Sequence, residues 1–239
     1  MPSVAERVFK KSGPFSGLNV IIRVRASVLK ISHGLQENGI VVGNVFDKYE
    51  SRNPLVREIM RGFNSGLAAL VAQAAPANVH ELGCGEGHWV LEWARQGISA
   101  RGSDFSEKII AMARDNAVSA QLDPGMFSVR SIYDIAPDTD SADLIVCSEV
   151  LEHLTDPLAG LAAIQRVASR HVILTVPREP LWCAMNMARG AYVRHWGNTP
   201  GHLQHWSTRQ FIALVERYFE VVAVKTPLPW TMLLCRVKD

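Results

Sequence analysis

The chain has 239 residues, of which 48% are hydrophobic and 20% are charged. These proportions exclude an intrinsically disordered protein, and the length suits one large domain better than two small ones. The 25 basic and 23 acidic residues give a formal net charge of +2, which argues against sequence-independent nucleic-acid binding, because such binding needs a concentrated cationic face.

The four cysteines lie far apart and form no CxxC pair; they are Cys84, Cys147, Cys183 and Cys235. This pattern is typical of a reducing compartment, so we expect a cytoplasmic protein. No apolar run reaches the ~18 to 20 residues of a membrane-spanning helix, and the start of the chain lacks the apolar core of a signal peptide. Peripheral contact with a membrane surface remains open.

Residues 1–45 read as an irregular, glycine-punctuated extension in which basic residues outweigh acidic ones. The basic residues are Arg7, Lys10, Lys11, Arg23, Arg25 and Lys30. A solvated extension is the simpler interpretation and a phosphate-binding arm is the alternative. Residues 46–239 are expected to form one domain.

A helix is predicted to begin at Asn53-Pro54, because Asn can cap a helix and Pro suits its first position. Apolar residues then recur at helical spacing at Leu55, Ile59, Phe63, Leu67 and Leu70. The rest of the chain alternates between strand and helix patterns. Strands are predicted at 79–82, 99–103, 126–130, 142–147, 171–176, 219–225 and 231–237. Helices are predicted at 89–95, 106–118, 157–167 and from Ser207, with a weaker spacer at 137–141.

Short apolar strands separated by amphipathic helices predict a mostly parallel sheet, because parallel connections need crossovers. Only residues 227–230 separate the last two strands, so these two form a hairpin. The sequence therefore predicts a Rossmann-like α/β fold. Its seven-stranded sheet has one antiparallel C-terminal strand and helices on both faces.

The segment Glu81-Leu-Gly-Cys-Gly-Glu-Gly87 ends a predicted strand and opens a helix. Glycines there allow a tight turn and let the backbone approach a ligand at the carboxyl end of the sheet. Asp104 closes the next strand, where a carboxylate can accept the ribose hydroxyls of an adenosine, and Phe105 could lie along the adenine. Asp104 and Ser106 also look like a helix start, and both interpretations can hold together.

Three segments in order, 81–87, 103–106 and 142–153, resemble the motifs of class I S-adenosylmethionine-dependent methyltransferases of the ubiquinone/menaquinone type. The resemblance covers about residues 75–225 and implies that S-adenosylmethionine is the methyl donor. It assigns a cofactor-binding set of Glu81, Gly83, Cys84, Gly85, Asp104, Phe105, Ser131, Ile132 and Ser148. Ser131 and Ile132 would end the third strand beside the adenine, although many relatives carry Asp at the first of these positions.

Glu149, Glu152 and His153 follow the fourth predicted strand and would face the cofactor crevice. Methyl transfer from a sulfonium is an in-line displacement, so the protein must mainly align the acceptor and exclude water. An oxygen acceptor must also lose a proton, and His153, with an unperturbed pKa near 6.5, is the natural general base. Alternatively, His153 only orients the turn.

The same residues, with a distant histidine, also resemble the metal-binding pattern of RNA-end 2′-O-methyltransferases and some ubiquinone O-methyltransferases. His202 is the better candidate for that histidine and His205 the weaker one. Oxygen and imidazole ligands suit a divalent ion, so metal dependence stays open. The nearby Trp206 is expected in the core.

An insertion at about 177–200 is rich in Leu, Met, Trp and Tyr with interspersed arginines. It could be a lid over an apolar acceptor, a patch that touches a membrane, or an ordinary core helix.

The sequence therefore predicts a methyltransferase acting on a small, apolar or lipid-linked acceptor, with O-methylation favoured. The alternatives are a divalent-metal-dependent RNA-end 2′-O-methyltransferase and a non-catalytic S-adenosylmethionine-binding protein. The acceptor and the oligomeric state lie beyond the sequence.

Overall fold

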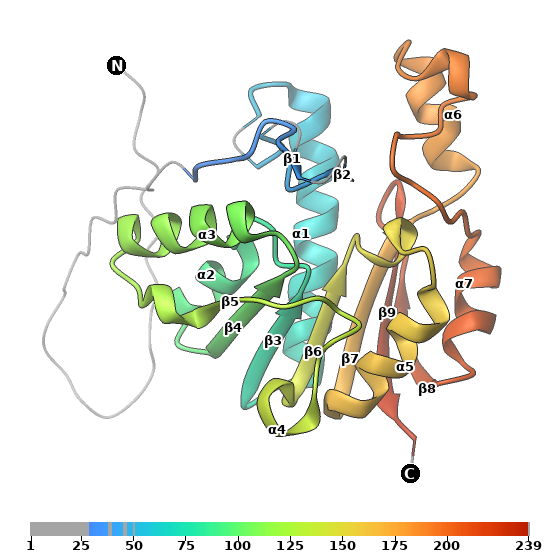
Figure 1. The fold of residues 1–239 in the computed structure, drawn as a ribbon. Coiled ribbons are helices and arrows are strands. Elements are labelled where there is room, and N and C mark those ends of the chain that lie inside the picture. The colour runs from blue at the N-terminus through green and yellow to red at the C-terminus, as the bar shows by residue number, and fades with distance from the viewer. Residues whose placement is uncertain (1–28, 38–39, 45–46, 50, 239) are drawn as a thin grey trace, which may run out of the picture.

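A seven-stranded sheet with the order β5-β4-β3-β6-β7-β9-β8 forms the centre of the computed structural model (Figure 1). The structure describes residues 29–37, 40–44, 47–49 and 51–238. β9 pairs antiparallel with β7 and β8, and every other pair of neighbouring strands in this sheet is parallel, so the predicted fold is confirmed. The strands are β3 (Asn78–Leu82), β4 (Ser99–Asp104), β5 (Phe127–Val129), β6 (Ala142–Ser148), β7 (Ala168–Pro177), β8 (Phe219–Lys225) and β9 (Trp230–Val237).

The first long helix, α1 (Pro54–Ala74), begins at the predicted residue, and the side chain of Asn53 accepts a hydrogen bond from the Leu55 N–H (2.9 Å). Leu55 itself is 66% exposed, so its predicted place on the apolar face is wrong. It lies in the exposed first turn of α1, where Val56 faces the core instead, followed by Ile59 and Met60. The other helices are α2 (His88–Arg95), α3 (Glu107–Ser119), α4 (Pro137–Asp140), α5 (Pro157–Val167), α6 (Leu181–Ala188), α7 (Thr208–Val215), and the short 3₁₀ turns η1 (Pro124–Met126), η2 (Leu151–His153) and η3 (Val193–His195).

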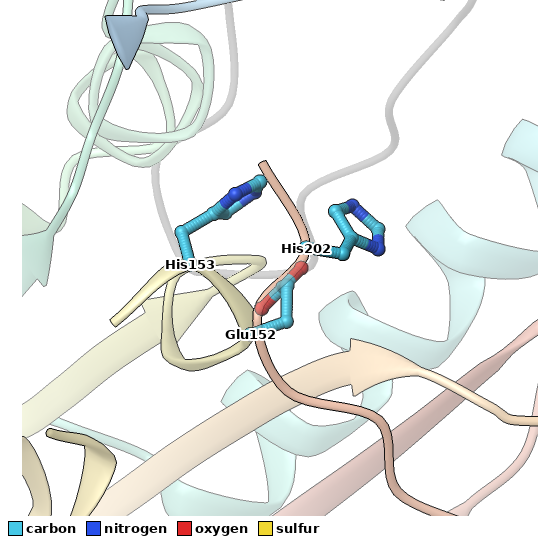
Figure 2. A group of neighbouring side chains, drawn as sticks. All are labelled: Glu152, His153 and His202. Atoms are coloured by element: carbon cyan, nitrogen blue, oxygen red, sulfur yellow. The ribbon is translucent and has the colours of Figure 1, made fainter. Parts of the chain in front are cut away.

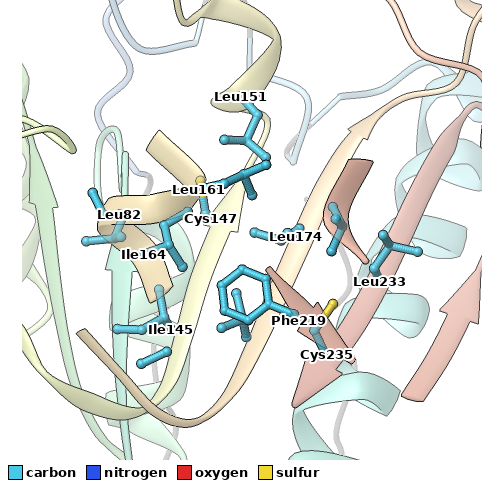
Figure 3. Close-up of a cluster of buried hydrophobic side chains, with 14 of the residues drawn as sticks. Leu82, Ile145, Cys147, Leu151, Leu161, Ile164, Leu174, Phe219, Leu233 and Cys235 are labelled. Atoms are coloured by element: carbon cyan, nitrogen blue, oxygen red, sulfur yellow. The ribbon is translucent and has the colours of Figure 1, made fainter. Parts of the chain in front are cut away.

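The sheet buries both faces, as expected for parallel strands joined by crossover helices. Helices α5 and α7 cover one face. Leu161 and Ile164 of α5 pack there against alternate residues of β6, β7 and β9 (Figure 3), and Phe211 of α7 joins the same cluster. Helices α1 and α2 cover the other face, where Leu67 and Trp93 pack against the intervening residues of the same strands. The alternation fixes which side chains of each strand reach the core and leaves the strand ends to carry polar groups.

The third strand is shorter than predicted, since β5 ends at Val129. Ser131 and Ile132 therefore lie in the turn after the strand and do not end it. The Arg130 N–H donates to the Asp104 carbonyl (2.9 Å), and the Ser131 carbonyl then accepts from the Asp134 N–H (3.0 Å), which turns the chain away from the sheet. The spacer at 137–141 forms the one-turn helix α4.

Residues 29–37 and 40–44, called here the N-terminal strap, carry the short strands β1 (Gln36–Glu37) and β2 (Ile40–Val41), which pair antiparallel. The strap is attached to the loop that follows β3, because the carboxylate of Glu86 accepts hydrogen bonds from the backbone N–H groups of Ser32 (3.0 Å) and Asn44 (2.7 Å). Lys30 of the predicted basic arm pairs with Asp115 (3.0 Å). The arm's other basic residues, between Arg7 and Arg25, lie outside the described residues.

All four cysteines are free thiols. Within the described part of the chain, no helix combines the length and the apolar character that crossing a bilayer requires.

Candidate active site

The loop at residues 83–87 joins β3 to α2 at the carboxyl end of the sheet. The N–H groups of Gly83 and Cys84 both donate to the Ser103 carbonyl (2.7 and 3.0 Å), which ties the loop to β4. Gly83 and Gly85 adopt φ of +72° and +54°. A Cβ on Gly83 would lie 2.3 Å from Val150 Cγ2, whereas a Cβ on Gly85 would meet no atom within 4 Å. Open space for a ligand therefore lies beside Gly85, and Gly83 is glycine because Val150 approaches it.

Asp104 ends β4 directly opposite this loop. Its Oδ2 accepts from the Gly85 N–H and its Oδ1 accepts from the Ser106 N–H (both 3.1 Å). Burial raises the pKa of Asp104, and these two N–H groups oppose the rise. Each carboxylate oxygen keeps a further lone pair for a hydroxyl donor. Ser106 caps α3, accepting from the Ile109 N–H (3.2 Å), so the carboxylate and the helix start share this corner as predicted.

Glu81, the acidic residue before the glycines, is 3% exposed, and its Oε2 has no hydrogen-bond partner among the described residues. Burial raises the pKa of Glu81 well above its usual range, and the Lys48 ammonium group opposes this effect. A buried carboxylate oxygen without a partner is costly, so this position suits a ligand that supplies an N–H group or a positive charge.

The remaining predicted cofactor residues differ in what their side chains offer. The Cys84 thiol packs in the apolar cluster with Val90, which leaves only its backbone for a ligand. Phe105 is 48% exposed beside Asp104. The Ser148 hydroxyl forms a hydrogen bond with Thr175 Oγ1 (2.9 Å), and the Ser131 hydroxyl accepts from the Tyr133 N–H (3.2 Å).

Glu149 and Glu152 follow β6 as predicted. Glu149 has φ of +58° and accepts from Thr175 Oγ1 (2.9 Å) and Trp230 Nε1 (2.6 Å). Burial raises the pKa of Glu149 to about 7, against the opposing effects of Lys48 and these two donors. Glu152 is 1% exposed, and neither of its carboxylate oxygens has a partner among the described residues. Burial, followed by the charge of Glu149, raises its pKa well above the usual range.

His202 and His153 lie beside Glu152, and one ligand atom from each of the three residues falls within 4.8 Å of the others (Figure 2). Figure 2 shows Glu152 and His153 on η2 and His202 on the neighbouring loop. His153 Nδ1 lies 2.9 Å from the Gly201 carbonyl, which can only accept, so Nδ1 carries the proton and Nε2 keeps a free lone pair. Burial lowers the pKa of His153, and it lowers that of His202 to about 3. Both imidazoles are therefore neutral near pH 7.

His205 stands apart from this group, because its Nε2 bonds Asn198 Oδ1 (2.9 Å). It belongs to a second cluster with Glu179 and Cys183. In that cluster the Cys183 thiol donates to Glu179 Oε1 (3.2 Å), so the thiol and this carboxylate already have each other as hydrogen-bond partners. Trp206 packs against the core cluster under α7, as predicted.

An aromatic wall that the sequence patterns did not reveal connects these groups. Trp182 lies between His202 and Trp230, with ring centroids 5.8 and 5.9 Å away, and Trp230 packs edge-on against Phe63 at 4.8 Å. Its members come from α1, α6 and β9.

Glu86 was also missed as a site residue: inside the glycine motif it looks like a loop residue, but it is 1% exposed and anchors the strap.

The model of a family described as a methyltransferase domain matches residues 55–224. The ubiquinone biosynthesis O-methyltransferase of Xanthomonas oryzae pv. oryzae is 30% identical over 125 residues, which cover 50% of this chain and 51% of that protein. The protein of the same name from Xanthomonas campestris pv. campestris is 29% identical over 123 residues. The matched segment thus spans about half the length of these curated relatives.

Two solved structures share the fold. The magnesium protoporphyrin IX methyltransferase of Synechocystis PCC 6803, with bound SAH, has a TM-score of 0.59 at 18% identity, covering 79% of this chain and 89% of its own. The N-methyltransferase NodS of Bradyrhizobium japonicum WM9 has a TM-score of 0.54 at 17% identity, covering 77% and 98%. With the family model spanning residues 55–224, the chain belongs to the methyltransferase domain family.

Proposed function

We propose that the chain is an S-adenosylmethionine-dependent methyltransferase that moves a methyl group to a small, apolar or lipid-linked acceptor, with O-methylation favoured. The observation that carries the proposal is the donor end of the site. Asp104 is bonded to the Gly85 N–H, open space lies beside Gly85, and Glu81 keeps a buried, unpartnered oxygen. In this proposal Asp104 accepts the ribose hydroxyls and Glu81 faces the methionine part. The ubiquinone O-methyltransferase relatives support an oxygen acceptor.

His153 is the proposed general base. With Nδ1–H donating to the Gly201 carbonyl, Nε2 can take the proton of a hydroxyl acceptor. A lowered pKa keeps the ring neutral at neutral pH, as a base requires. The aromatic wall of Trp182, Trp230 and Phe63 supplies the apolar surface that aligns such an acceptor and keeps water from the sulfonium.

Calorimetric titration with S-adenosylmethionine tests the donor site. Asp104→Ala is expected to weaken donor binding at least tenfold, because a charge-assisted hydrogen bond contributes roughly 1.5 to 3 kcal/mol. Asp115→Ala, at an exposed carboxylate paired with Lys30, is the matched control and should bind as the unaltered chain does. Equal binding by Asp104→Ala, or no binding by the unaltered chain, would contradict the proposal.

A labelled-methyl assay against fractionated cell extract then identifies the acceptor without a guess about its class. Methylated product lost in His153→Ala supports the base. Tight donor binding with no product in any fraction would favour the alternative of a non-catalytic S-adenosylmethionine-binding protein.

A second candidate, a divalent-metal-dependent enzyme, is favoured by one observation: both oxygens of buried Glu152 lack partners beside two neutral histidines. The residues fit the group, since Glu152, His153 and His202 supply the oxygen and imidazole ligands that divalent ions prefer, with Glu149 adjacent. A bound ion would act as a Lewis acid on the acceptor oxygen. Loss of turnover after chelation, restored by Mg²⁺ or Mn²⁺ and accompanied by activity on RNA ends but not phenolic compounds, would select the RNA-end alternative.

Peripheral membrane contact completes the proposal for a lipid-linked acceptor. Apolar side chains around η3 are exposed, with Trp196 at 82% and Val193 at 58%, and Leu203 of the histidine loop is 53% exposed. Exposed arginines accompany them at 189 and 194. Such a mixture suits the boundary between head groups and acyl chains.

A further inference from the structure

Trp182 and Asn186 lie one turn apart on α6, and both side chains reach the same hydroxyl group. Trp182 Nε1 donates to Thr199 Oγ1 (2.9 Å), and Asn186 Nδ2 donates to the same oxygen (3.1 Å). Asn186 also donates to the Gly197 carbonyl (2.8 Å). Every residue of α6 is described, and Asn186 is the one that is buried. Helix α6 therefore docks on the following loop through polar contacts and is not an ordinary core helix.

The loop held in this way carries His202. The His202 N–H donates to the Thr199 carbonyl (3.0 Å), so the residue bonded by α6 forms the turn that presents the histidine. The next N–H groups, of Leu203 and Gln204, both donate to the Glu152 carbonyl (2.8 and 3.0 Å). The loop is thus fixed at one end by α6 and at the other by the backbone of Glu152.

The Trp182 ring makes a second, direct contact with the site. It stacks on the His202 ring with an interplanar angle of 28° and also packs against Trp230, whose Nε1 donates to Glu149. The Trp182 indole therefore contacts His202 on one side and Trp230 on the other, and Trp230 in turn donates the hydrogen bond to Glu149. An imidazole can rotate about its side-chain bonds, and a stacked ring removes that freedom.

We propose that Trp182 and Asn186 are positioning residues, which act through Thr199 and the stacked indole to hold His202 against Glu152 and His153. The inference rests on the proposed function, because it concerns the acceptor end of the same site. It assigns α6 the role of a scaffold for the histidine loop. Removing groups that orient a functional histidine commonly costs ~10- to 100-fold in metal affinity or activity.

Two pairs of variants test the proposal. Thr199→Val removes the shared hydroxyl at nearly constant shape, and Thr199→Ser retains it. Trp182→Leu removes the ring, and Trp182→Phe keeps a ring without the N–H. Met187→Ala, at a 39% exposed position of α6, is the matched control. Thermal unfolding establishes that each variant is folded.

The measurements are the affinity for S-adenosylmethionine, the affinity for Mn²⁺ by electron paramagnetic resonance, kcat and KM separately, and the NMR resonance of His202 Hε1. We expect Thr199→Val and Trp182→Leu to lower kcat and Mn²⁺ affinity ~10- to 100-fold while donor affinity is unchanged. Thr199→Ser should restore both values. The His202 resonance should move in Thr199→Val, which keeps the indole and its ring current, and stay in place in Thr199→Ser and Met187→Ala.

An unmoved His202 resonance in Thr199→Val, together with unchanged kcat and Mn²⁺ affinity in both Thr199→Val and Trp182→Leu, would overturn the inference. Failure of the proposed function has a different signature, since the unaltered chain would then transfer no methyl group. In that case the NMR measurement on Thr199→Val still decides on its own: a displaced His202 resonance supports the positioning role, and an undisplaced one removes it.

Discussion

Gly83 and Gly85 are separated by one residue, yet a side chain at each position meets a different environment. An added Cβ collides with Val150 at the first position and enters open space at the second. Both residues have positive φ, which costs a residue with a Cβ roughly 1 to 2 kcal/mol. Backbone conformation alone therefore predicts similar losses of stability for an alanine at Gly83 and at Gly85. The neighbouring atoms are what make the two substitutions differ.

We predict that Gly85→Ala folds with a stability loss of about 1 to 2 kcal/mol and binds S-adenosylmethionine weakly, because the new methyl group occupies the ligand's space. Gly83→Ala should lose far more stability, and adding Val150→Ala should recover part of it. Thermal unfolding and calorimetric titration measure both effects. Gly85→Ala with unchanged donor affinity would show that the open space is not the donor site.

Glu149 gives a pH-dependent prediction. Its pKa is about 7 in the folded chain and near 4.3 when unfolded. Between these values the unfolded chain releases the proton first, so this residue's contribution to the free energy of unfolding is full below about pH 4.3 and is lost as pH rises through 7. Buried His202, with a folded pKa of about 3, contributes with the opposite sign below pH 6.5.

Subtracting the free energy of unfolding of a Glu149 variant from that of the unaltered chain at each pH separates the Glu149 contribution from that of the histidines. Relative to Glu149→Gln, the unaltered chain should lose stability between pH 5 and pH 8 in urea unfolding. Glu58→Gln, at an exposed carboxylate on α1, is the control and should show no such difference. A difference between the unaltered chain and Glu149→Gln that is constant over this range would mean that the Glu149 carboxyl titrates normally.

At the scale of elements, local patterns predicted what local physics decides. The helix starts at Ser106 and Ser207, the start of α1 and the C-terminal hairpin all follow from neighbouring residues, and the structure has each of them within a residue of its predicted place. The aromatic wall could not be predicted, because Phe63, Trp182 and Trp230 are far apart in the sequence and meet only in the folded chain. The end of β5 was wrong by one residue, since its register depends on the partner strand β4.

The strap gives a prediction at this scale. Glu86 accepts from the Ser32 and Asn44 N–H groups and from Asn44 Nδ2 (2.6 Å), and hydrogen bonds to a charged group contribute ~1.5 to 3 kcal/mol each. Glu86→Ala should therefore release the strap locally while the sheet stays folded. Hydrogen exchange should accelerate for the amides of Ser32 and Asn44 and remain slow in β3 and β6.

If the effect is local, Glu86→Ala should lower the affinity for S-adenosylmethionine less than Asp104→Ala does. The strap is bonded to Glu86, whereas Asp104 is proposed to contact the donor directly. Glu92→Ala, at a partly exposed carboxylate on α2, controls for the loss of a negative charge. Unchanged protection of Ser32 and Asn44 in Glu86→Ala would mean that other contacts hold the strap.

At the scale of the whole molecule, the proposed donor-binding residues and the histidine loop both lie at the carboxyl end of the parallel strands, the usual ligand edge of open α/β sheets. Helix α6 stands at this same edge (Figure 1). The exposed apolar side chains that follow it, Val193 and Trp196, therefore belong to the same part of the fold as the proposed acceptor site.

This arrangement predicts that the chain sediments with anionic phospholipid vesicles and that Trp196→Ser and Val193→Ser weaken the association. Burying one large apolar side chain contributes ~1.5 to 3 kcal/mol, so each change should lower vesicle affinity about tenfold or more. Val118→Ser, at a 62% exposed position on α3, should have no effect. In Trp196→Ser and Val193→Ser, KM for a lipid-linked acceptor should rise, because that acceptor is taken from the vesicle. KM for a short-chain, water-soluble analogue should stay the same. Equal sedimentation of the unaltered chain and both variants would leave η3 without a membrane role, and the acceptor would then reach the site from water.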